Sequence, residues 1–110
     1  MEPLGLSSDV IAERQLYILG EDPAREIIVR LGRPQRKTNN PNDYFCPYVI
    51  LGLGAQVVRG ASGVDAFQAI QLTLKQIAYE LTIRNAGLDG RLRWLGDDEV
   101  DIGFRVEDSM

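Results

Sequence analysis

Three cations stand close together in the chain, at Arg33, Arg36 and Lys37. Guanidinium groups form paired, charge-assisted hydrogen bonds with phosphates and carboxylates, so this cluster could bind an anion. The surrounding stretch, 33–43, holds two prolines and three asparagines, which are residue types that favour turns. A solvated loop is therefore the favoured interpretation and anion binding is the alternative, because three cations without interleaved aromatic residues fall short of a nucleic-acid surface.

Carboxylates gather near the C-terminus in an acidic run made of Asp97, Asp98, Glu99 and Asp101. Carboxylate oxygens bind hard cations, but the spacing lacks the Asp-x-Asp-x-Asp-Gly order of a calcium loop. We therefore predict no metal site and interpret the run as a solvated turn. The alternative is an acidic surface that faces a basic partner, where charge mainly steers the encounter.

The single tryptophan, Trp94, precedes the acidic run and follows Arg93. Tryptophan and arginine are enriched among the residues that dominate the energetics of interfaces. Packing of Trp94 in the core is the favoured interpretation, with an interface as the alternative. If the chain binds a protein, the residues predicted to make the contact are Arg93, Trp94, Asp97, Asp98 and Asp101.

Groups that could perform acid–base or nucleophilic catalysis are scarce. The chain has no histidine, which is the commonest general base near neutral pH. Its single cysteine, Cys46, lies in the apolar run 44–48, where burial raises a thiol pKa, so we interpret it as a core thiol. Asp65 and Tyr44 remain as acid–base candidates. The glycines at 52, 54, 60 and 63 match neither a dinucleotide nor a phosphate loop, and we predict no catalytic residue and no cofactor.

Apolar alternation predicts the first strands. Over Glu26–Gly32 it places Ile27, Val29 and Leu31 on one side, as in a half-buried strand. The stretch Val10–Leu19 is predicted as the preceding strand, and the turn at 20–23 joins the two into a hairpin.

A third strand is predicted over Tyr44–Leu53, which is apolar on both faces. Pro47 has no N–H to donate, so this strand lies at a sheet edge there, bulges, or begins only after position 47. Shorter strands are predicted over Gln56–Gly60, Arg91–Leu95 and Val100–Val106.

A long helix is predicted from about Gly63 to Asn85. Ser62 stands three residues before Asp65, an arrangement that can cap a helix start, and no glycine or proline interrupts 64–86. A second, partial apolar stripe of Leu72, Tyr79 and Ile83 lies off the main one, so the helix could contact a second sheet. The main stripe, expected to face the core, consists of Val64, Phe67, Ile70, Leu74, Ile77 and Leu81.

Several strands followed by one long helix predict an α+β fold, with an antiparallel sheet of four or more strands and one long helix packed on one face. At 110 residues the chain is expected to form a single domain, 1–110, with a loose N-terminus over 1–9.

Charge and hydropathy narrow the classes of partner and compartment. The formal net charge of −4 repels phosphate backbones, which argues against nucleic acid. The longest apolar runs are far shorter than the roughly 20 residues that cross a bilayer, so we predict no membrane span. One cysteine and no signal-peptide pattern predict a cytoplasmic protein.

A resemblance rests on the runs YFCPY at 44–48, GVDAFQAIQL at 63–72 and LRWLG at 92–96, together with Gly52-x-Gly54. With these motifs, the chain from about 12 to 104 resembles a family of short bacterial proteins of unknown function. The helix motif is also similar to helices in small bacterial immunity-type proteins. The resemblance implies a bacterial, cytoplasmic protein that makes contacts, such as an inhibitor of a toxin. It transfers no activity, cofactor or catalytic residue.

Two functions therefore stay open at this point. The favoured hypothesis is a non-enzymatic module of bacterial type that self-associates or binds a protein partner and is immunity-like. The alternative is an anion-binding protein for small molecules or a histidine-free enzyme. Its anion would be held by the sheet face or by Arg33, Arg36 and Lys37, with Asp65 or Tyr44 as the acid–base group.

Overall fold

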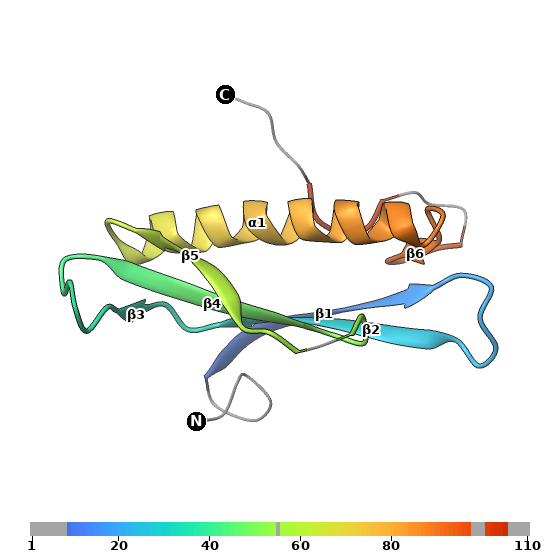
Figure 1. Cartoon of the computed structure of the whole chain (residues 1–110), viewed down its shortest axis with the longest axis horizontal. Helices are drawn as coiled ribbons and strands as arrows, with labels where there is room; N and C mark the ends of the chain where they lie inside the picture. Colours follow the sequence, from blue (N-terminus) through green and yellow to red (C-terminus); the bar gives the residue numbers. More distant parts are fainter. Residues whose placement is uncertain (1–8, 55, 98–100, 106–110) are drawn as a thin grey trace.

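The computed structural model describes residues 9–54, 56–97 and 101–105, which form a sheet with one helix packed on one face (Figure 1). This confirms the α+β prediction. In chain order the described elements are β1 (Val10–Ile18), β2 (Arg25–Gly32), β3 (Gln35–Arg36), β4 (Tyr44–Leu51), β5 (Arg59–Gly63), α1 (Ala66–Gly87) and β6 (Leu92–Arg93).

The described strands form one six-stranded antiparallel sheet. The predicted hairpin is confirmed, since β1 pairs with β2 from Val10 opposite Gly32 to Ile18 opposite Arg25. On its far side β1 pairs only near its end with β6, while β4 pairs with β2, β3 and β5. Strand β5 therefore borders one side of the sheet and β6 the other.

Pro47 lies inside β4 and faces Gly60 of β5 in the ladder. The pairing of β4 with β2 ends at Leu31 opposite Tyr48, and the pairing with β3 resumes at Gln35 opposite Phe45. Three residues, 32–34, therefore lie opposite the two β4 residues Cys46 and Pro47, so the pairing is irregular at Pro47. A bulge, one of the predicted alternatives, accommodates the missing N–H. Strand β3 lies within the predicted loop 33–43, which is therefore not all loop.

The start of α1 differs from the prediction. The N-cap is Asp65, whose Oδ1 accepts a hydrogen bond of 2.8 Å from the Gln68 N–H. The Gln68 side chain in turn accepts from the Val64 N–H at 2.8 Å, which completes a reciprocal cap. Ser62 and Gly63 belong to β5, so the predicted strand at 56–60 is displaced towards the helix.

The face of α1 that packs on the sheet also differs from the predicted main stripe. Ile77 and Leu81 are buried as expected, but Phe67 is 79% exposed and Val64 is 70% exposed. The buried positions instead follow a four-residue spacing, through Ala69, Thr73, Ile77 and Leu81.

Small residues decide which face of α1 approaches the sheet. A Cβ at Gly63 would lie 2.6 Å from the backbone nitrogen of Ala69, so β5 and the first turn of α1 are in close contact. Side chains as large as Phe67 do not fit such an approach and lie outside it. The helix therefore packs mainly on β4 and β5.

The core lies between α1 and the sheet. The expected inward residues of β2, Ile27, Val29 and Leu31, are all buried there. The described members of the core are Leu16, Ile18, Ile27, Val29, Leu31, Cys46, Tyr48, Ile50, Leu53, Ala69, Ile77, Leu81, Leu92 and Ile102.

The segment after α1 adds to this core without the predicted strand over Val100–Val106. Residues 101–105 are not in a strand, and the rest of that prediction lies outside the described residues. Ile102 is buried, and Phe104 packs against the core from the same segment. The predicted loose N-terminus, 1–9, lies almost wholly outside the described residues. Among the described helices, none is long and apolar enough to cross a membrane.

Candidate functional site

The two residues predicted to lead a protein interface, Arg93 and Trp94, make contacts within the chain. Arg93 donates hydrogen bonds to the carbonyl oxygens of Asp97, Gly90 and Leu92. Trp94 is half-buried against the core, and the Arg14 guanidinium lies 4.2 Å from the centre of its ring. These contacts favour the core-packing interpretation of Trp94, and its role in binding stays a prediction.

The acidic run is described in part. Asp97 accepts a hydrogen bond from the Tyr17 hydroxyl, and this bond raises the pKa of Tyr17, helped by partial desolvation. Asp101 accepts from the Gly103 N–H at 2.8 Å, which shapes the turn before Phe104. Asp98 lies outside the described residues, as does Glu99. Within the described part of the chain, no three acidic or cysteine residues gather as metal ligands would.

The predicted anion cluster has separate partners along its loop. The Arg36 guanidinium lies 5.5 Å from the centre of the Tyr44 ring and donates to the Pro41 carbonyl at 3.4 Å. Lys37 Nζ is 3.4 Å from Ser62 Oγ. The backbone N–H of Arg33 donates to the Asp9 carbonyl at 2.8 Å. None of the three cations lines the large cavity described below, and anion binding by them stays a prediction.

The acid–base candidates and the thiol have structural partners. Asp65 caps α1, and Tyr44 lies half-buried in β4 beneath Arg36. Cys46 is buried, and this burial raises the pKa of its thiol, which donates to the Gly32 carbonyl at 3.5 Å.

A polar contact that the sequence did not suggest joins β4 to α1. The buried Tyr48 hydroxyl donates to the Glu80 carboxylate. Burial, and secondly this bond, raise the pKa of Tyr48 far above its ordinary value. No sequence signal pairs these two residues, because they are 32 positions apart and the apolar alternation of β4 marks Tyr48 only as inward-facing.

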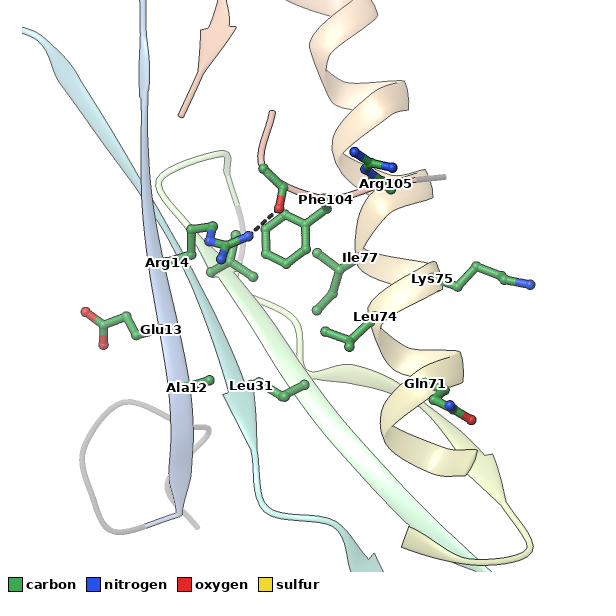
Figure 2. Close-up of a pocket in the computed structure, with 12 residues that line it drawn as sticks. Ala12, Glu13, Arg14, Leu31, Gln71, Leu74, Lys75, Ile77, Phe104 and Arg105 are labelled. Atoms are coloured by element: carbon green, nitrogen blue, oxygen red, sulfur yellow. Dashed lines mark hydrogen bonds between the residues drawn. The ribbon is translucent and has the colours of Figure 1, made fainter. Parts of the chain in front are cut away.

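A cavity of about 540 Å³ lies between α1 and the β1–β2 half of the sheet. It opens there because α1 packs on β4 and β5. Figure 2 shows Leu31, Leu74, Ile77 and Phe104 around this space, with the Arg14 side chain reaching into it from β1. Sequence reasoning missed Arg14, which looks like an ordinary polar position at the start of a strand.

A second candidate surface is the outer stripe of α1, made of Leu72, Tyr79 and Ile83. The sequence placed these residues off the main stripe, and their exposed fractions are 39%, 47% and 69%. No second sheet covers them within the described residues, contrary to the suggested contact. The outer stripe is therefore apolar surface on the side of the helix away from the core.

These features of the described residues define a small α+β domain whose polar candidates are mostly engaged in its own fold. They also include an open apolar cavity and an exposed apolar helix stripe. Residues 12–106 match the family model of DUF6968, a domain of unknown function, and the chain belongs to this family. Its predicted membership of an uncharacterised family is thereby confirmed. Comparison with curated proteins found no match, and comparison with solved structures found none either.

Proposed function

We propose that this protein is a non-enzymatic interaction module that self-associates through the outer stripe of α1. The observation that carries the proposal is the exposure of three large apolar side chains, Leu72, Tyr79 and Ile83, on one side of a 22-residue helix. Contiguous exposed apolar residues mark interaction sites in soluble proteins, whereas scattered ones need no explanation. The three follow spacings of seven and four, which is the spacing of a helix–helix seam.

The stripe suits pairing with a second copy about a two-fold axis. In such an interface the same patch is used twice, so residue i meets residue j and j meets i. If two copies of α1 pack antiparallel and the two-fold axis passes midway between Gln76 and Tyr79, Leu72 faces Ile83 of the partner subunit. Tyr79 then lies at the centre of the seam, where a large aromatic side chain contributes most.

The non-enzymatic part of the proposal is supported by the structural roles of the acid–base candidates and of the thiol. Asp65 holds the helix start, and Tyr44 lies under the Arg36 guanidinium. The Cys46 thiol is buried with a raised pKa, the opposite of an activated nucleophile. We also propose a bacterial, cytoplasmic protein, on the basis of the motif resemblance and the buried free cysteine.

Paired charge substitutions test the proposed geometry. Leu72→Lys and Ile83→Glu should each make the chain monomeric by light scattering, since each places two charges in the seam of its own dimer. Mixing the two variants should restore a dimer, because Lys meets Glu on one side and Ile83 meets Leu72 on the other. Thr82→Glu, at an exposed neighbouring position, is the matched control and should stay dimeric.

The outcome also separates self-association from binding of a different protein. A monomeric wild-type chain would overturn the self-association proposal and leave a heterologous protein partner as the remaining form of the interaction hypothesis. Variants that associate like the wild type would move the interface away from α1. A mixture that stays monomeric would reject the antiparallel arrangement.

A further inference from the structure

We infer that the cavity between α1 and the β1–β2 hairpin binds a small amphipathic carboxylate, with Arg14 holding the acid group. This site is separate from the outer stripe, so the inference does not depend on self-association.

The walls of the cavity are suited to an apolar body. They consist of Val29 and Leu31 from β2, Leu74 and Ile77 from α1, and Phe104 from the segment after β6. A volume of about 540 Å³ lies within the range of roughly 300–1,000 Å³ that is typical of small-molecule sites. The hairpin and the helix each supply one wall, so the site is preformed by the fold.

One charged group reaches into this apolar space. The Arg14 guanidinium lies 4.2 Å from the centre of the Trp94 ring and 5.1 Å from that of Phe104. It also donates to the Gly103 carbonyl. Two rings and a carbonyl thus fix the position of the cation before any ligand arrives, which lowers the entropy cost of binding.

The charge of Arg14 is not neutralised within the described chain. No carboxylate among residues 9–54, 56–97 and 101–105 lies within ion-pair distance of it. Its neighbour Glu13 also lines the cavity, but its carboxylate points away from Arg14 (Figure 2) and pairs with Arg30 at 3.1 Å.

Two further cations line the cavity, Lys75 and Arg105; both are exposed, and the Lys75 amine points away from Arg14 (Figure 2). Glu13 is the carboxylate among the lining residues. In a chain whose net charge is −4, this local surplus of positive charge favours an anion.

The chemistry of the ligand follows from these two features together. A guanidinium with free N–H groups forms paired hydrogen bonds with a planar carboxylate, and the apolar walls favour a hydrocarbon or aromatic body attached to it. A fully polar anion such as inorganic phosphate would leave the walls in contact with water, and a neutral apolar molecule would leave Arg14 without a counter-charge.

Three probes with the same ten-carbon chain test the inference on the full-length protein. Isothermal titration calorimetry below the micelle concentration should find decanoate bound about tenfold more tightly than decanol. Decyltrimethylammonium should bind most weakly. Equal affinity for all three, or binding of none, would overturn the inference.

Two substitutions then locate the site. Arg14→Gln should reduce decanoate affinity to the level of decanol and leave decanol unchanged, whereas Arg25→Gln, an exposed arginine outside the cavity, should change neither. Leu74→Trp, at a position that tolerates bulk because it is partly exposed, should fill the cavity and weaken both probes. If Arg14→Gln fails to fold by circular dichroism, the order of the three probes and Leu74→Trp still decide. Unaltered decanoate binding in Leu74→Trp would place the ligand elsewhere.

Discussion

The hydroxyl of Thr73 donates a hydrogen bond of 2.8 Å to the carbonyl oxygen of Cys46 and thereby ties α1 to β4. The Thr73 hydroxyl oxygen also accepts a hydrogen bond of 3.0 Å from the Ala61 N–H of β5, so one side chain of the helix bridges two strands. Thr73 is fully buried, and its hydroxyl lies where Cys46 and Ala61 face each other in the ladder of β4 and β5. The helix is thus part of the hydrogen-bonding of the sheet as well as its cover.

Removing the Thr73 hydroxyl should destabilise the folded protein. Thr73→Val keeps the shape of the side chain but leaves a buried carbonyl and an N–H without their partner, which should lower the free energy of unfolding by about 1–3 kcal/mol. Chemical denaturation measures the loss. Thr82→Val is the matched control, because the exposed Thr82 bonds to the Ala78 carbonyl of its own helix, and it should change stability by less than about 0.5 kcal/mol. Equal losses in the two variants would contradict the bridging role.

The close approach of β5 and α1 makes a second prediction. In Gly63→Ala the new Cβ would lie 2.6 Å from the Ala69 backbone nitrogen, so the helix or strand must shift, at a cost of about 1–3 kcal/mol. At Gly87 nothing lies within 4 Å of an added Cβ, and Gly87→Ala should be neutral or stabilising by up to about 1 kcal/mol. Thermal unfolding of both variants checks the contrast, and an unaffected Gly63→Ala would refute the account of which helix face is buried.

Trp94 should contribute to the stability of the fold and leave association unchanged. Trp94→Ala removes a half-buried ring that contacts Arg14 and the core, and should cost about 1–3 kcal/mol. The solution mass should stay that of the wild type. Leu95→Ala, at a neighbour that is 73% exposed, should change neither quantity. A normal stability with altered association would instead favour the interface that the sequence suggested at Arg93 and Trp94.

The decrease in the free energy of unfolding at alkaline pH should depend on Tyr48. Its folded-state pKa is raised, so the neutral hydroxyl is favoured in the native protein. Below the ordinary tyrosine pKa of about 10 both states are protonated, and above it the unfolded chain loses the proton first, so the free energy of unfolding falls as the pH rises. Tyr48→Phe should fall less steeply above about pH 10 than the wild type.

The wild-type chain provides the reference for this measurement. Denaturation at a series of pH values gives the slopes. If the slope of Tyr48→Phe matches that of the wild type, the buried hydroxyl does not account for the loss.

Local pattern predicted much of the fold and little of the candidate sites. The alternation of Ile27, Val29 and Leu31 defined an inward face correctly, because strand periodicity is a property of neighbouring residues. The helix itself was also predictable. Its buried face was not, since Phe67 has the right spacing for a core residue but lies outside the close approach of Gly63 to Ala69.

The sites depend on contacts between distant parts of the chain. Arg14 gains its position from Trp94 and Gly103, which are 80 and 89 residues away. Periodicity carries no information on such partners. The outer stripe of α1 could be identified from sequence because its three residues lie on one helix, whereas its exposure required knowledge of what covers the helix.

The most direct test of the central proposal is the solution mass of the wild-type chain, measured by light scattering across a concentration series. Self-association through Leu72, Tyr79 and Ile83 predicts twice the mass of one chain at high concentration, with a fall towards the mass of one chain on dilution. The mass of a single chain at every concentration would contradict it.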